Sequence, residues 1–260
     1  MENKTSLLKI GNEIVFTQSG IHYEMKPGTV YNVSYDRYGD DVKLVEAPGL
    51  QMPNDLYTPI EDVKFMNKVI NHYNKSNRTT GVILTGTKGS GKTVMAKNIA
   101  MQSNLPIIVI DKSLRPCFLK TLFNKLENIH VCVIFDEIDK LGNDYDDDYL
   151  LQILDGISSS SKHLVIATCN DADDINEYLI DRCDRIRYFR TFNEMRPSMI
   201  KCILNDRLDD KKKTDSLTDF IIKNFGCISF DNVSSFIEEV NEYPETSYEE
   251  LFNDMNISQK

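Results

Sequence analysis

Short apolar runs separated by turn signals mark the first 54 residues. Three of these runs are rich in β-branched and aromatic residues, as strands are; they are Glu13–Thr17, Thr29–Tyr35 and Val42–Val45. Gly, Pro and Asn or Asp between the runs favour turns, as at Pro27-Gly28 and Gly39-Asp40. The pattern predicts a small β-rich module over residues 1–54.

The spacing of apolar positions changes after residue 54. A helical period runs over Glu61–Tyr73, where apolar side chains recur every three or four residues. Four short apolar runs follow, with helical stretches between them: Gly81–Thr85, Pro106–Asp111, Val131–Asp136 and His163–Thr168. Buried strands that alternate with helices are typical of a parallel sheet covered on both faces. This interpretation makes residues 55–190 an α/β core.

No strand is predicted beyond Arg190. The apolar spacing there suits four helices, over Met195–Leu208, Ser216–Phe225, Asp231–Tyr243 and Tyr248–Met255. Residues 191–260 are therefore expected to form a small helical lid after the α/β core.

Charge and hydropathy narrow the function classes. The net charge is −10, and the longest basic run is only Lys211-Lys212-Lys213, which disfavours a nucleic-acid partner. The longest apolar runs, such as Leu105–Ile110, are too short to cross a bilayer, and the first residues lack the apolar stretch of a signal peptide. We expect a soluble, cytoplasmic protein with no membrane partner.

The strongest chemical signal follows the first buried strand of the α/β core. It fits the phosphate-loop pattern G-x-x-x-x-G-K-[ST] between a strand and a helix, with the residues Gly86, Thr87, Lys88, Gly89, Ser90, Gly91, Lys92 and Thr93. Glycines let the backbone turn its N–H groups onto phosphates, and the helix that follows adds its positive N-terminal dipole. Lys92 is expected to reach the β and γ phosphates of ATP, and the Thr93 hydroxyl to bind Mg²⁺.

Two adjacent carboxylates end the third buried strand of the α/β core. Asp136 and Glu137 follow the apolar run Val131–Phe135, at the strand end where α/β proteins bind ligands. With a phosphate loop in the same chain, Asp136 is predicted to hold Mg²⁺, and Glu137 to act as the general base toward the attacking water. The fold class that results is α/β: a P-loop NTPase αβα sandwich with a parallel sheet, a C-terminal helical lid and a small N-terminal β-rich module.

From residue 55 onward the chain resembles the AAA+ ATPase superfamily. Ile134–Asp139 is similar to its Walker B segment, Leu150–Gly156 to the LL-x-x-LDG helix of the AAA clade, and Val165–Asn170 to the sensor 1 strand. The resemblance implies that Asn170 helps to position the water near the γ-phosphate.

A further segment resembles the part of AAA+ proteins that completes a neighbouring subunit's site. Leu179–Arg185 is similar to the Ser-Arg-Cys segment of clamp loaders, with Asp181 in place of Ser. The resemblance implies that Arg182 is an arginine finger, with Arg185 as a second candidate. A finger that acts between subunits implies a homo-oligomeric ring, most often hexameric.

The chain also departs from the superfamily's pattern. The sensor 2 arginine is missing, since no Lys or Arg occurs over residues 224–259, and this favours the AAA clade. Phe118-Leu119 matches the aromatic–hydrophobic pore loop of unfoldases poorly, and a pair that faces the core is the preferred interpretation.

These observations favour a ring ATPase that remodels a protein or a protein assembly. The alternative is a nucleic-acid-associated AAA+ ATPase, such as a helicase loader or a clamp-loader-like subunit. The Arg182-Cys183 pair favours that alternative, whereas the acidic run Asp144–Asp148 disfavours it. The chain also resembles the short AAA ATPases of tailed phages, and a phage-encoded protein would act in the host cytoplasm.

Overall fold

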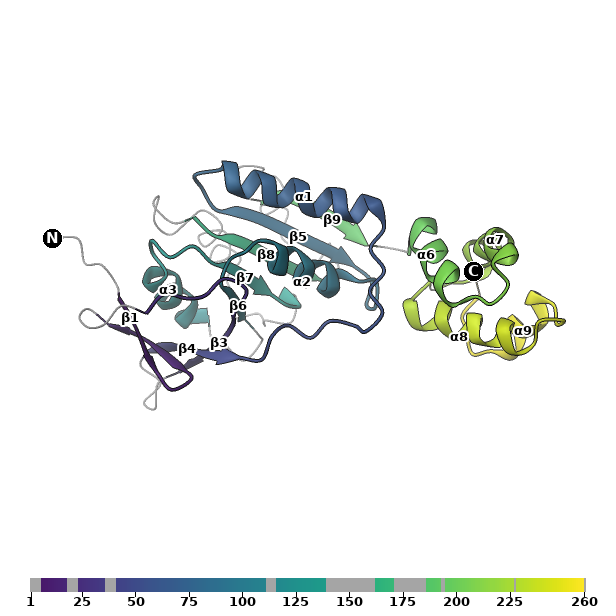
Figure 1. Cartoon of the computed structure of the whole chain (residues 1–260), viewed down its shortest axis with the longest axis horizontal. Coiled ribbons are helices and arrows are strands. Elements are labelled where there is room, and N and C mark those ends of the chain that lie inside the picture. Colours follow the sequence, from purple (N-terminus) through teal and green to yellow (C-terminus); the bar gives the residue numbers. More distant parts are fainter. Residues whose placement is uncertain are drawn as a thin grey trace. The chain divides into compact units, whose positions relative to one another are not determined.

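The computed structural model describes residues 6–17, 23–35, 41–110, 116–138, 162–170, 186–192, 195–226 and 228–259. The chain divides into two compact units (Figure 1). The first consists of Met1–Met52, Phe65–Thr85 and Lys92–Thr191, and the second of Pro53–Lys64, Gly86–Gly91 and Phe192–Lys260. None of the described helices is both long enough and apolar enough to cross a membrane.

A mixed sheet is the centre of the first unit. Its strand order is β1-β2-β4-β3-β6-β7-β8-β5-β9. The central strands β6 (Ile107–Ile110), β7 (Cys132–Phe135), β8 (Leu164–Cys169) and β5 (Thr80–Gly86) are parallel to one another. All residues of β7, β8 and β5 are buried, because helices cover both faces of this part of the sheet. The parallel α/β core predicted from the apolar runs is confirmed.

The N-terminal strands extend this sheet. They are β1 (Ser6–Ile10), β2 (Glu13–Thr17), β3 (Val30–Tyr35) and β4 (Val42–Ala47). They pair antiparallel with one another, and β3 also pairs in parallel with β6, with Tyr31 opposite Ile108. The β-rich character of this region is as predicted, and its strands share hydrogen bonds with the α/β core.

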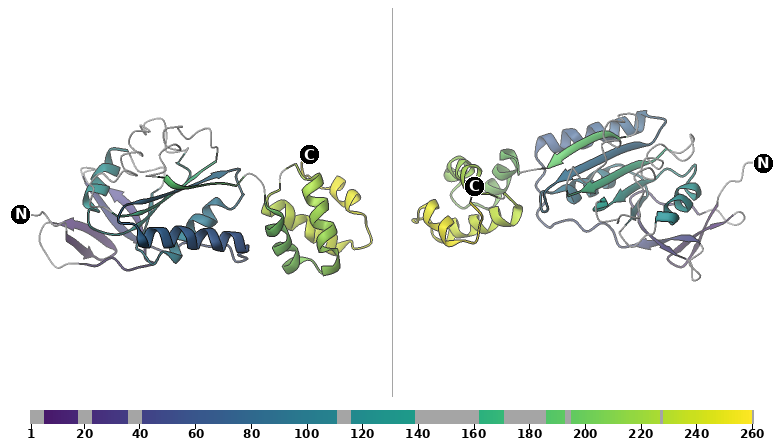
Figure 2. Two further views of the ribbon diagram at one scale, coloured as in Figure 1. Left: turned by 90° about the horizontal axis from the view of Figure 1, so that it is seen from above. Right: turned by 180° about the vertical axis from the view of Figure 1, so that it is seen from behind.

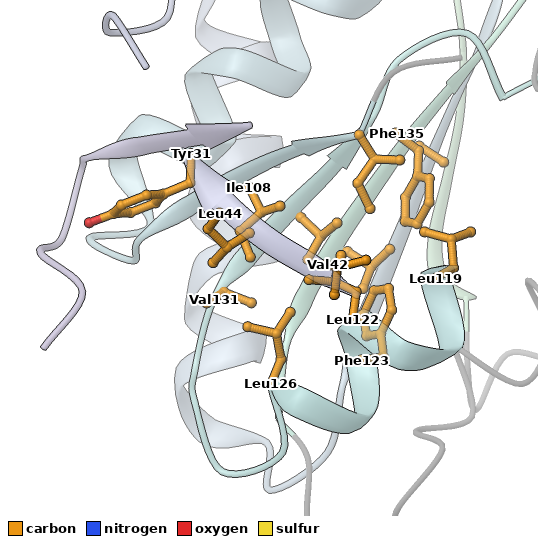
Figure 3. Close-up of a cluster of buried hydrophobic side chains, with 14 of the residues drawn as sticks. Tyr31, Val42, Leu44, Ile108, Leu119, Leu122, Phe123, Leu126, Val131 and Phe135 are labelled. Atoms are coloured by element: carbon orange, nitrogen blue, oxygen red, sulfur yellow. The ribbon is translucent and has the colours of Figure 1, made fainter. Parts of the chain in front are cut away.

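Helices lie on both faces of the sheet in Figure 2. Helices α1 (Ile60–Lys75) and α2 (Lys92–Gln102) cover one face, and α3 (Pro116–Lys125) packs against the other. Figure 3 shows the apolar cluster under α3, to which strands β3, β4, β6 and β7 all contribute side chains. Leu119 is fully buried in it and the Phe118 ring packs against Tyr35, so this pair faces the core, as preferred from the sequence.

Four α-helices and one 3-10 helix make up most of the described part of the second unit. They are α6 (Pro197–Arg207), η2 (Lys211–Lys213), α7 (Thr214–Asn224), α8 (Phe230–Glu242) and α9 (Tyr248–Asp254). Their apolar faces form a separate core in which the rings of Phe225, Phe236 and Phe252 pack on one another. Serine hydroxyls cap α8 and α9, since Ser229 and Ser247 accept hydrogen bonds from backbone N–H groups of the first turn. The helical C-terminal region is confirmed.

The segment that leads into α1 packs with these helices. Asp55 forms an ion pair with Arg207, and the Tyr57 hydroxyl donates to an Asp206 carboxylate oxygen at 2.6 Å. Asp62 is buried and forms an ion pair with Arg196. A buried carboxylate is tolerated when a cation compensates it, so this pair joins the start of α1 to the helical unit.

Candidate active site

The predicted phosphate loop connects β5 to α2. The strand ends at Gly86 and the helix begins at Lys92, which is the strand–loop–helix context that the motif requires. Gly86, Gly89 and Gly91 have φ values of +132°, +78° and +96°. Residues with a Cβ rarely adopt these φ values. The three glycines therefore allow the backbone conformation of the loop. A Cβ on Gly86 would also lie 2.0 Å from the carbonyl oxygen of Phe192.

The remaining loop residues differ in exposure. Thr87 and Lys88 are exposed and Ser90 is partly buried. Lys92 is only 6% exposed. Its position at the first residue of α2 fits the predicted role toward phosphate oxygens.

Asp136 comes directly after β7 and is held by two hydroxyl groups. The Thr93 hydroxyl, in the first turn of α2, donates to Asp136 Oδ1 at 3.0 Å. The Thr168 hydroxyl on β8 donates to the same oxygen at 2.8 Å. The β7–β8 register pairs Phe135 with Ala167, so the next positions, Asp136 and Thr168, come opposite each other.

Strand alternation places these groups on the α2 face of the sheet. Phe135 and Ala167 point into the cluster under α3, and successive side chains of a strand point to opposite faces. Asp136 and Thr168 therefore point to the face on which α2 packs. Thr93, in the first turn of α2, contacts Asp136 there.

Glu137 has an unusual backbone conformation. Its φ is +55°, in the left-handed region that costs a residue with a Cβ about 1–2 kcal/mol. Its backbone N–H donates to the Thr168 hydroxyl oxygen at 2.8 Å. This hydrogen bond contributes to holding the chain in the strained conformation directly after the strand.

Asn170 directly follows β8 and lies beside the Glu137 side chain. Its side-chain amide Nδ2 lies 3.4 Å from Glu137 Oε1 and donates to it. The structure thus brings together Thr93, Asp136, Glu137 and Asn170, which come from the start of α2 and from the ends of two neighbouring parallel strands.

The oxygen donors of this site fit Mg²⁺. Thr93 supplies a hydroxyl and Asp136 a carboxylate, which are hard oxygen ligands of the kind Mg²⁺ takes. Their oxygens lie 3.0 Å apart, close enough to serve one ion together. The chemistry of the residues present agrees with the predicted Mg²⁺ site.

Some predicted residues lie outside the described residues. These are Arg182, Arg185, the segment 150–156 that resembles the AAA-clade helix, and the acidic run Asp144–Asp148. The roles given to Arg182 and Arg185 stay predictions.

No motif in the sequence assigns a role to Thr168. A polar residue within the apolar run Leu164–Cys169, close to Asn170, is the signal that points to it. Buried hydroxyls need hydrogen-bond partners, and the nearest available ones at that strand end are the acidic residues after β7.

The chain is similar to known ATPases. The family model for the ATPase family associated with various cellular activities (AAA) matches residues 82–191. The chain is 34% identical over 122 residues to an ATP-dependent zinc metalloprotease FtsH of Heterosigma akashiwo, covering 38% of this chain and 18% of that protein. It is 30% identical over 193 residues to the chloroplastic ATP-dependent zinc metalloprotease FTSH 2 of Oryza sativa subsp. japonica, covering 65% and 27%.

A third relative is named as an ATPase and not as a protease. The chain is 26% identical over 231 residues to the peroxisomal ATPase PEX6 of Dictyostelium discoideum, covering 70% of this chain and 19% of that protein. The chain thus spans no more than 27% of the length of any of these three relatives.

Proposed function

The chain belongs to the AAA+ ATPase superfamily, and we propose that its candidate active site hydrolyses ATP with the help of Mg²⁺. The observation that carries this proposal is the placement of Glu137 and Asn170 beside the Thr93–Asp136 pair. A carboxylate base, a polar side chain that orients water and a hard oxygen site are the parts that phosphoryl transfer to water needs.

The phosphate loop and the first turn of α2 would bind the triphosphate. Backbone N–H groups of residues 86–91 surround phosphate oxygens in loops of this kind, and the α2 N-terminus adds a positive dipole. The Lys92 ammonium would offset charge on the β and γ phosphates. Thr93 and Asp136 would hold Mg²⁺, which when bound neutralises charge on the phosphate oxygens.

Glu137 would take a proton from the attacking water. The water oxygen then forms a bond to the γ-phosphorus, the bond from that phosphorus to the ADP oxygen breaks, and ADP leaves. The Glu137 carboxylate holds the proton that the water loses. Asn170, in contact with the same carboxylate, is placed to orient the water.

We further propose that a ring of this chain uses ATP hydrolysis to remodel a protein or protein assembly. The similarity to ATP-dependent proteases supports work on proteins. The protease activity in the names of these relatives is not part of this proposal. The net charge of −10 supports a protein substrate over nucleic acid.

Glu137→Gln tests the hydrolytic site. The variant keeps the size of the side chain and its contact with Asn170 but cannot take up the proton, so phosphate release should fall about 10²–10⁴-fold. ATP affinity, measured by calorimetry, should stay near the wild-type value because the phosphate loop and Asp136 are unchanged. Wild-type turnover in this variant would mean that another group is the base.

A further inference from the structure

Thr168 is a polar residue inside an otherwise apolar, fully buried strand. It is 0% exposed, between Ala167 and Cys169 on β8. Its hydroxyl makes two hydrogen bonds, and both go to the pair of acidic residues after β7. It donates to Asp136 Oδ1 and accepts the backbone N–H of Glu137, each at 2.8 Å.

The chemistry of the two partners explains why a hydroxyl stands here. An ionised carboxylate only accepts hydrogen bonds and a backbone N–H only donates one, so the group between them must both donate and accept. A hydroxyl is such a group. The β-branch of threonine also restricts χ1, and this keeps the Thr168 oxygen directed toward Asp136 and Glu137.

The hydroxyl therefore couples the position of one acidic residue to the other. The Glu137 backbone is left-handed, and the direction of its side chain follows from that conformation. With its N–H tied to Thr168, Glu137 presents its carboxylate to Asn170. Without this hydrogen bond, one of the contacts that hold the left-handed backbone is lost.

We propose that Thr168 is a positioning residue for ATP hydrolysis, which fixes Glu137 relative to Asp136 through a single hydroxyl. The inference rests on the proposed role of Glu137 as the base. Packing alone does not explain the residue, because valine has nearly the same shape and suits a buried strand better. Thr168→Val removes only the hydroxyl, and both of its partners belong to the acidic residues of the site, namely the Asp136 carboxylate and the Glu137 backbone N–H.

The test compares Thr168→Val with the conservative Thr168→Ser in the full chain. Phosphate release is measured against ATP concentration at saturating Mg²⁺. Thr168→Val should lower kcat about 10- to 100-fold, as the loss of a group that orients a ligand or base does. KM for ATP should change by less than about threefold, because the phosphate loop is untouched. Thr168→Ser keeps the hydroxyl and should retain kcat within about threefold of wild type.

A second measurement separates positioning from general damage. In a Glu137→Gln background, Thr168→Val should lower kcat by less than about a further threefold. The effects of two residues that act through the same group are not additive. A similar loss of kcat in both backgrounds, full activity of Thr168→Val, or failure of Thr168→Ser to retain kcat would each overturn the inference. If Thr168→Val does not fold by circular dichroism, Thr168→Ala takes its place with the same expectations.

The two proposals fail in different ways. Full turnover in Glu137→Gln alone contradicts the proposed base. Slow turnover in Glu137→Gln together with wild-type kcat in Thr168→Val leaves the base in place and overturns only the role of Thr168.

Discussion

At the scale of single residues, His163 shows how burial alters an ionisable group outside the candidate site. It precedes β8, is 1% exposed, and its ring meets Phe123 edge-on at 5.7 Å between centroids. Neither ring nitrogen has a hydrogen-bond partner among the described residues. Burial, with a smaller contribution from His130, lowers the pKa of His163 to about 4. The imidazole is therefore neutral in the folded protein at pH 7.

This low pKa predicts a loss of stability in mild acid. The unfolded chain takes up the proton near pH 6.5 and the folded chain only near pH 4, so the free energy of unfolding falls as pH drops between these values. The total loss in the free energy of unfolding should be about 3 kcal/mol. Urea unfolding at several pH values measures this loss. His163→Leu should remove most of this slope, whereas His72→Gln should remove only a small part of it, because burial also lowers the pKa of the partly exposed His72. An unchanged slope in His163→Leu would contradict the assignment.

Most residues of the candidate site could be predicted because their spacing carries the chemistry. Lys92 and Thr93 follow from the glycine pattern, and Asp136 and Glu137 from a strand that ends in carboxylates. Thr168 could not be found in this way. Its role depends on which strand lies beside β7, and that pairing joins segments about 30 residues apart in sequence.

At the scale of elements, the junction of β5 with the phosphate loop is sterically tight. Gly86 ends β5 with φ at +132°, and the backbone of Phe192, at the end of β9 (Ile186–Phe192), is so close that a Cβ has no room. The carbonyl of Phe192 belongs to the main chain and cannot rotate away as a side chain could. The glycine therefore allows two strand ends to approach each other as well as allowing the loop to turn.

Gly86→Ala is expected to destabilise the protein by about 1–3 kcal/mol, because the methyl group must displace backbone and φ is unfavourable for alanine. Thermal unfolding measures the effect. Gly49→Ala is the matched control: nothing lies within 4 Å of the added Cβ, so its change should stay within about 0.5 kcal/mol. Equal midpoints for the two variants would show that the close approach to Phe192 does not exist in solution.

The elements that the sequence analysis missed are the two edge strands. β1 (Ser6–Ile10) and β9 (Ile186–Phe192) lie at opposite ends of the strand order. In β9 only Ile186 is buried. The other positions of the strand, which include two arginines, are exposed or partly exposed. An edge strand is covered less than a central one and so lacks the continuous apolar run that identified β6, β7 and β8.

At the scale of the whole molecule, the sheet of the first unit continues from the α/β core into the N-terminal strands. The link is the parallel pairing of β3 with β6, at Val30–Ile107 and its two neighbouring pairs. Composition predicted strands in residues 1–54 but not this pairing, because a parallel contact between distant segments leaves no local signal in the sequence. The shared cluster under α3 binds the two regions together in one apolar core.

We propose a ring in which Arg182 completes the ATP site of a neighbouring subunit. A guanidinium against the transferred phosphoryl group contributes about 10³–10⁵ in rate, so Arg182→Ala should bind ATP but hydrolyse it very slowly.

Lys92→Ala should lose ATP affinity about 10- to 100-fold, since a charged hydrogen-bond partner of the phosphates is removed. Lys88→Ala, in the exposed part of the same loop, is the matched control and should stay active.

The most direct measurement is phosphate release from a mixture of Lys92→Ala and Arg182→Ala subunits. The first variant keeps its arginine and the second keeps its phosphate loop, so where they adjoin in the right order one complete site forms. Each variant alone should be nearly inactive, and an equimolar mixture should regain about one quarter of the wild-type rate if subunits mix at random around the ring. A mixture no faster than its parts, or a fully active Lys92→Ala or Arg182→Ala variant, would contradict the ring ATPase.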